Sequence, residues 1–172
     1  MYNVEREEYM EAYRRTFVTT IESKLRAFQL KLLHNILFTN SRLYKMKIVE
    51  TDRCTLCKTE LETVPHLLYE CTHTQDLWNR VTNTWFRKVG IHSLSEKDRM
   101  FGLTTGNYEK FLNHIILAAK FYIYKCRVIE AKVVFTEFRI FLRHTEMIES
   151  KIAEAKGKLI KHNQKWNLLE VD

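Results

Sequence analysis

Cys54-Thr-Leu-Cys57, followed by His66-Leu-Leu-Tyr-Glu-Cys71, places three cysteines and one histidine close together in the chain. Two cysteines separated by two residues can direct both thiolates at one ion from a tight turn, and His66 and Cys71 can complete a tetrahedral set from the next segment. Four protein ligands leave no coordination position for water. The stretch therefore predicts one structural Zn²⁺ ion and not a catalytic metal.

Two alternatives for these cysteines are inert burial in a core and a redox pair. A thioredoxin-like pair opens a helix after a strand, whereas Cys54 follows the polar residues 50–53. The four-ligand spacing favours zinc over both. His73 is an alternative fourth ligand because it stands two residues after Cys71, but a thiolate is the softer donor and Cys71 is preferred.

Composition indicates an all-α protein. The chain has 172 residues with only one proline and four glycines, and no segment alternates polar with β-branched residues. We expect a helical domain with a small CCHC zinc knuckle between helices. Its segments are predicted as an N-terminal helix or linker at 1–19, the zinc-binding helical module at 20–90 and a helical C-terminal extension at 91–172.

Apolar spacing and capping residues predict the helices and their ends. A helix that begins at Thr63 should carry His66 and then loosen before Cys71, because five residues of an ideal helix turn through about 500° and would place the two ligands on different faces. The stretch 108–156 is predicted to be two helices, with a break near residues 130–134. The other expected features are helices at 3–16, 21–38 and 74–88, a short helix from Thr39 to about 47, a capping box at Ser95 and an anchoring side chain at Trp166.

The charge balance favours an anionic partner. Lys and Arg number 28 against 21 Asp and Glu, which gives a net charge of +7 and a pI near 9.2. No secretory signal opens the chain, and charged residues interrupt the apolar stretch 111–128, so neither secretion nor a membrane span is expected. In a reducing compartment clustered cysteines favour metal over disulfides. Cys126 is expected to be a small buried residue.

The positive charge lies outside the predicted zinc site. Residues 21–47 carry six basic side chains and one acidic one, residues 110–165 carry twelve and five, and residues 48–109 sum to −2. On the long helical stretch the later cations recur at intervals of seven and four, which predicts that they share one face, near Phe121, Tyr124 and Phe135. The alternative for the cations is an ordinary solvated face, and the alternative for the aromatics is a role in the core. The candidate nucleic-acid-binding residues are Lys24, Lys31, Arg42, Lys45, Lys125, Lys132, Arg139 and Arg143.

The chain resembles a known family over about residues 20–86. The motifs that carry the resemblance are, in order, Leu32-Leu-His34, Thr39-Asn40, the CCHC spacing with Glu62-Thr63 inside it, and Leu77-Trp78. They are similar to the zinc-binding region that follows the reverse transcriptase domain of non-LTR (LINE-type) retrotransposons. The resemblance implies that the zinc ligands are Cys54, Cys57, His66 and Cys71.

The same resemblance implies a role in binding nucleic acid during target-primed reverse transcription. RNA or DNA and the rest of the polyprotein are the implied partners, in an intracellular ribonucleoprotein of nucleus and cytoplasm. The sequence lacks a Tyr/Phe-x-Asp-Asp polymerase motif and a restriction-like nuclease constellation, so we do not expect an enzyme. The alternative is a protein-interaction scaffold that packs on the polymerase or a host factor. His34 is expected to be buried and hydrogen-bonded, not a further ligand.

Overall fold

The computed structural model describes residues 6–104 and 106–169, and within these ranges it is helical, as predicted, with one isolated antiparallel bridge between Arg53 and Leu61. The predicted first helix is present, although its positions 3–5 lie outside the described residues. The α-helices are α1 Arg6–Thr19, α2 Ser23–Leu33, α3 Asn40–Lys45, α4 Thr72–Val81, α5 Glu96–Phe101, α6 Glu109–Val128, α7 Phe135–Ala155 and α8 Leu159–Trp166. Short π turns η1 His66–Glu70 and η2 Thr82–Phe86 and 3₁₀ turns η3 Arg87–Val89 and η4 Gly106–Tyr108 complete the order.

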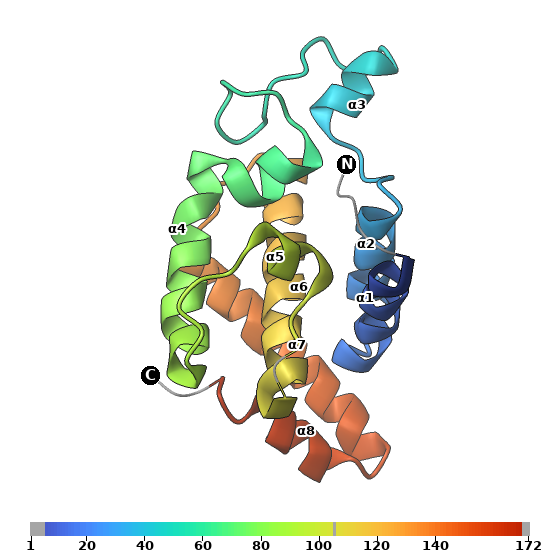
Figure 1. The fold of residues 1–172 in the computed structure, drawn as a ribbon, viewed down its shortest axis with the longest axis vertical. Helices are drawn as coiled ribbons and strands as arrows, with labels where there is room; N and C mark the ends of the chain where they lie inside the picture. Colours follow the sequence, from blue (N-terminus) through green and yellow to red (C-terminus); the bar gives the residue numbers. More distant parts are fainter. Residues whose placement is uncertain (1–5, 105, 170–172) are drawn as a thin grey trace.

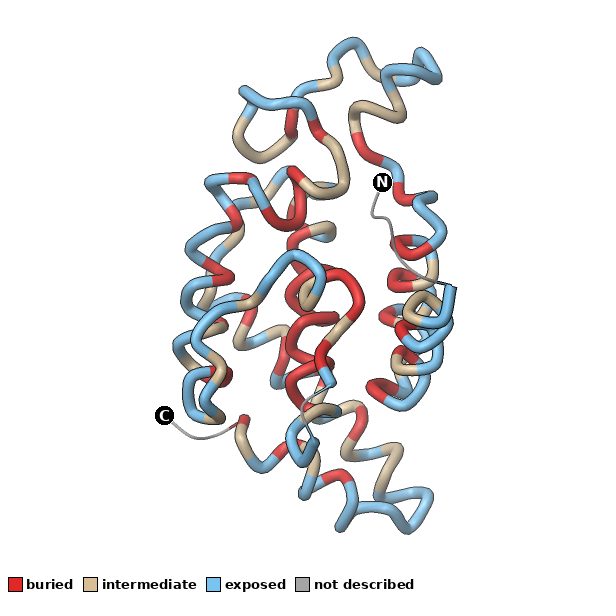
Figure 2. Tube along the Cα trace, viewed as in Figure 1, coloured by how far each residue is buried: buried red, intermediate tan, exposed pale blue. Residues whose placement is uncertain are grey.

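Helix α6 is the centre of the core. It is apolar on most of its circumference, and residues 111–120 are all buried, which is typical of a helix surrounded by others. Helices α1 and α2 lie on one side of it and α4 on the other, while α7 crosses it (Figure 1). The buried positions are densest along α6, and the end of the molecule that carries α3 is mostly exposed (Figure 2).

Helices α6 and α7 are separate, which confirms the predicted break. The chain leaves α6 through Glu130, whose φ of 54° is left-handed, and the N–H of Ala131 bonds the carbonyl of Cys126 at 2.9 Å. Cys126 is buried, as expected. Helix α7 then packs Phe138 against Trp85, with ring centroids 6.3 Å apart. This contact joins the C-terminal helices to the segment that follows the zinc region.

A buried ionic network joins α8 to the rest of the fold. Lys165 donates to Glu149 at 2.7 Å and to the carbonyl of Thr19 at 2.8 Å, and Trp166 is buried against Phe111. Burial lowers the pKa of His114 to about 3, so this histidine is neutral and Lys165 is the charged partner of Glu149. Burial alone would raise the pKa of the Glu149 carboxyl, but its basic neighbours hold it well below its usual range. Trp166 is thus the anchor that the sequence predicted.

Lys120 lies inside the core, where its ammonium donates to the side-chain oxygen of Gln29 at 2.7 Å and to the carbonyl of Met100 at 3.1 Å. Burial lowers its pKa to about 7. The hydrogen bonds compensate part of the cost of removing an amine from water. Among the described residues, no helix has the length and apolar character needed to cross a membrane.

Helix α2 is shorter than the predicted 21–38. It ends at Leu33 because Asn35 adopts a left-handed conformation with φ 51°, and the N–H of Ile36 then bonds the carbonyl of Lys31 at 2.9 Å. The expectation that His34 is buried is wrong. Its ring is exposed and lies edge-on to Tyr9, with centroids 6.2 Å apart. The early end of α2 frees the chain to turn towards α3.

Helix α3, residues 46–65 and η1 together form one end of the molecule, which we call the zinc lobe (Figure 1). The lobe has little apolar core of its own, since α3 contains no buried residue. The short helix after Thr39 is nevertheless where the sequence predicted it, with Thr39 as its N-cap residue. Residues 40–65 are therefore held by polar contacts and the predicted metal ligands, whereas η1 also packs Leu67, Leu68 and Tyr69 on the core.

Candidate metal centre

The first two ligands lie in a tight knuckle. The N–H of Lys58 bonds the carbonyl of Cys54 at 2.8 Å, and the N–H of Cys54 bonds the carbonyl of Glu60 at 2.7 Å, so the chain reverses around the pair. Lys58 has a left-handed φ of 64°, which allows the turn. Cys57 accepts a hydrogen bond from the hydroxyl of Thr59 at 3.3 Å. The Cys-x-x-Cys spacing therefore turns both sulfurs to the same side.

The other two ligands are separated by the π turn η1. The hydroxyl of Thr63 accepts from the N–H of His66 at 3.1 Å, which confirms Thr63 as the start of this turn. The helix then widens, and the N–H of Cys71 bonds the carbonyl of His66 at 2.8 Å across five residues. Cys71 itself is extended, with φ −60° and ψ 129°. The helix loosens before Cys71, as predicted, and this change brings the side chains of His66 and Cys71 to the same side.

The four side chains converge on one point. The ligand atoms of Cys54, Cys57, His66 and Cys71 all lie within 4.8 Å of one another. The sulfurs of Cys54 and Cys71 are 4.0 Å apart, and the sulfur of Cys57 is 3.4 Å from Nε2 of His66. Tetrahedral zinc with Zn–S bonds of about 2.3 Å separates its donor atoms by about 3.8 Å. The cluster therefore fits one structural zinc ion, and with three of its four residues buried it is closed to solvent.

The thiols have unequal acidity before metal binds. Burial raises the pKa of Cys54 to about 12 and also raises that of Cys71. Burial acts against ionisation of Cys57 too, but hydrogen bonds from the backbone of Glu60 and from Thr59 lower its pKa to about 5. Because zinc binds thiolates, Cys57 is ready as a ligand at neutral pH while Cys54 and Cys71 must release protons.

His73 lies outside the cluster. It is exposed on the first turn of α4 and contacts its neighbour Thr72, with its Nδ1 3.3 Å from the hydroxyl oxygen. We expect His73→Ala to retain a full equivalent of zinc, and Cys71→Ala to lose it, because only Cys71 points at the other ligands. Elemental analysis of the two purified variants measures this. Zinc in Cys71→Ala but not in the double variant with His73→Ala would show that the histidine takes over.

Glu62 is a structural part of the centre that sequence reasoning did not single out. Its buried carboxylate accepts from the N–H of Thr55 in the knuckle at 2.6 Å and from the N–H of Asn40 at 2.7 Å, and it pairs with Arg127 of α6 at 2.9 Å. Arg127 also donates to the side chain of Asn40 at 2.7 Å. One carboxylate thus ties the knuckle to α3 and to the central helix. Its sequence signals were its place between the ligands and the Glu62-Thr63 motif of the family resemblance, neither of which indicated its structural role.

The eight predicted nucleic-acid-binding residues are not brought together. Lys24 and Lys31 lie exposed on α2, while Arg42 and Lys45 lie on α3. The later four cations were expected to share one face. That expectation is wrong, because the helix ends after α6 and the four residues lie on separate elements. Lys125 is on α6, Lys132 is in the connection, and Arg139 and Arg143 are on α7.

The aromatic residues that were considered as base platforms are core residues. Phe121 and Tyr124 both pack on Phe28, with ring centroids 5.5 and 5.6 Å away, and Phe135 packs on Trp85 at 6.0 Å. Their rings are partly buried against the hydrophobic core. The alternative stated for them, that they fill the core, is the correct one.

Comparison with known proteins agrees with the geometry of the centre. No curated protein matches the chain. Residues 1–78 match the family described as zinc-binding in reverse transcriptase, and this segment contains all four clustered side chains and Glu62. Residues 1–78 of the chain are therefore similar to the zinc-binding domains of reverse transcriptases.

Proposed function

We propose that the chain is a nucleic-acid-binding domain of a LINE-type retrotransposon reverse transcriptase, in which a CCHC zinc site stabilises the fold and the domain grips RNA during target-primed reverse transcription. The observation that carries the proposal is the family match at residues 1–78 next to a strongly basic segment at residues 21–47. The centre is closed, so its role is to fix backbone and not to activate water. Binding, and not catalysis, is the proposed activity.

The proposed partners follow from this placement. RNA, or an RNA–DNA junction with primed target DNA, would be held by phosphates, and the polymerase part of the same polyprotein would lie beside the domain. An intracellular ribonucleoprotein, in cytoplasm and nucleus, is the proposed setting. The positive charge of α2 and α3 supports an anionic partner because the cations Lys24, Lys31 and Lys45 are exposed.

Salt dependence tests the proposed function. Affinity for a labelled single-stranded RNA is expected to fall as salt rises, with a log–log slope of about 0.7 for each phosphate contacted, because binding releases condensed counterions. Fluorescence anisotropy at several salt concentrations measures the slope. A flat response, or no binding near physiological ionic strength, would contradict the proposal.

A second candidate function is a protein-interaction scaffold. Helix α1 favours it, because Met10, Tyr13, Phe17 and Val18 expose apolar surface on that helix. A scaffold would bind nucleic acid weakly and without salt dependence. The salt dependence of RNA binding therefore separates the two functions, and charge reversal at Lys132, Arg139 and Arg143 tests in addition whether these three cations contact the RNA.

A further inference from the structure

We infer that the groove beside α3 binds an unpaired segment of nucleic acid, with cations on its wall and two aromatic rings near it. This inference rests on the proposed function and locates it on a part of the molecule that no motif identifies. Of the eight candidate nucleic-acid-binding residues, it assigns the contact to Arg42 and Lys45.

The groove lies between α3, the segment that leads into it and the start of η1. Its volume is about 350 Å³, and its lining is mostly polar. The hydroxyl groups of Thr39 and Ser41 bond each other at 3.0 Å, and the hydroxyl of Thr63, which accepts from the N–H of His66, can donate its own hydrogen to a phosphate oxygen. We call it the α3 groove, and its lining residues are Asn35, Leu37, Thr39, Ser41, Arg42, Lys45, Thr63, Val64 and Pro65.

The groove carries net positive charge. Arg42 and Lys45 line it, and no acidic residue does. Within the part of the chain that the structure describes, neither side chain forms an ion pair, so both charges are available to a ligand. Glu62 lies nearby but is buried and neutralised by Arg127. Two further exposed cations are close in sequence to the lining residues: Lys31 stands four residues before Asn35, and Lys47 stands two residues after Lys45.

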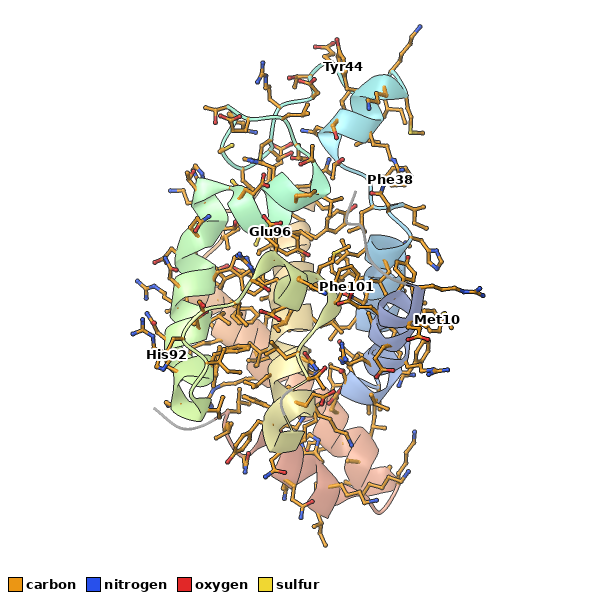
Figure 3. The ribbon with its side chains drawn as sticks, in the orientation of Figure 1. Met10, Phe38, Tyr44, His92, Glu96 and Phe101 are labelled. Atoms are coloured by element: carbon orange, nitrogen blue, oxygen red, sulfur yellow. The ribbon has the colours of Figure 1, made fainter. Side chains whose placement is uncertain are left out.

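Two exposed aromatic rings accompany these cations. Phe38 is 51% exposed and Tyr44 is 49% exposed, and both lie at the end of the molecule that carries α3 (Figure 3). At 100° per residue, Tyr44 projects roughly 60° from Ser41, which lines the groove. The backbone under Phe38 is fixed, since its carbonyl accepts from the hydroxyl of Tyr124 at 3.2 Å. Exposed rings on a fixed backbone are suitable stacking partners for bases.

The ligand chemistry follows from this combination. Phosphate contacts alone would suit any nucleic acid, but stacking on Tyr44 and Phe38 requires bases that are not paired and stacked in a duplex. Neither Phe38 nor Tyr44 is among the residues that pack against the hydrophobic core, so both rings are accessible to a base. A single-stranded segment, such as an RNA end or loop, is therefore the expected occupant.

Substitution of the groove cations tests the location. We expect Arg42→Ala with Lys45→Ala to weaken binding of a single-stranded RNA 12-mer at least tenfold, and to lower the salt slope by about 1.4, since each lost phosphate contact removes about 0.7. The matched control is Lys156→Ala with Lys161→Ala, which removes the same charge from exposed positions far along the chain. Zinc content and thermal unfolding show that each variant is folded.

Substitution of the ring tests the strandedness. Tyr44→Ala is expected to weaken single-stranded RNA binding by roughly 5- to 150-fold, the range for loss of one stacked base, and to leave duplex RNA binding unchanged. Tyr44→Phe should retain wild-type affinity. If folded wild-type protein binds no RNA, the proposed function itself fails. If wild type binds but the groove variants bind as well as the control variant, the function stands and the inferred location is wrong, with a protein contact as the better explanation of the groove.

Discussion

Removal of zinc is expected to unfold the zinc lobe. The metal-free domain should no longer show the cooperative thermal transition of the zinc-bound protein at the same midpoint temperature. Structural zinc in small domains contributes on the order of 10 kcal/mol of apparent folding free energy. The lobe depends on this contribution because α3 has no buried residue and the chain between α3 and η1 is irregular. Without zinc, His66 and Cys71 are no longer held at one point. The buried residues between them, Leu67 and Leu68 on η1, should then lose their position on the core.

Chelation of wild-type protein and the variants Cys54→Ser and His66→Ala provide three independent routes to the metal-free state. Circular dichroism should show a loss of helix, and elemental analysis a loss of zinc, in all three. Cys126→Ala is the matched control, since Cys126 is a buried cysteine of α6 outside the cluster. It should keep its zinc and lose only about 1 kcal/mol. A metal-free wild-type protein that still melts cooperatively at the same temperature would show that zinc is not structural.

Substitution Glu62→Gln is expected to destabilise the fold by about 3 kcal/mol and to weaken zinc retention. The neutral amide offers one oxygen where the carboxylate accepts from Asn40, Thr55 and Arg127, and it leaves the arginine without its anionic partner at a partly buried position. Breaking a buried pair by removing one partner usually costs about 3–5 kcal/mol. Because the same carboxylate holds the knuckle, the position of Cys54 and Cys57 should loosen as well.

Urea unfolding gives the change in free energy, and competition with a chelator gives the change in zinc affinity. The matched control is Glu60→Gln, an exposed glutamate of the same loop, which should change stability by less than about 0.5 kcal/mol. In the double variant with Arg127→Met the uncompensated charge is gone, so part of the lost stability should return. If Glu62→Gln and Glu60→Gln changed the free energy of unfolding and the zinc affinity equally, the pair of Glu62 with Arg127 would contribute no more than an exposed charge.

Local chemistry made much of this protein predictable from its sequence. A Cys-x-x-Cys pair followed by His66 and Cys71 matches the geometry that one zinc ion requires, whatever the surrounding fold. An ideal helix turns about 100° per residue, so His66 and Cys71, five residues apart, would lie on different faces. This predicted that the helix loosens before Cys71. The capping box at Ser95 is also present, with Ser95 accepting from the N–H of Asp98 at 3.1 Å.

Prediction failed where distant segments meet. Helical spacing placed the cations from Lys125 to Arg143 on one face, but these residues span the break near residue 130 that the sequence itself predicted, so they lie on separate elements. Left-handed Asn35 likewise ended α2 early and exposed His34. The left-handed conformation of Asn35 has a weak sequence signal, because Asn also occurs inside helices.

The sequence alone determined the helical class, the metal and the side chains that converge on it, because ligand type and spacing are local properties of the chain. Only the tertiary structure decided that Glu62 meets Arg127 across the fold, that Lys120 is buried on Gln29, and that Arg42 and Lys45 share a groove. These contacts join residues far apart in the chain, and the packing of α6 against its neighbours sets their distances. No periodicity within one segment carries that information.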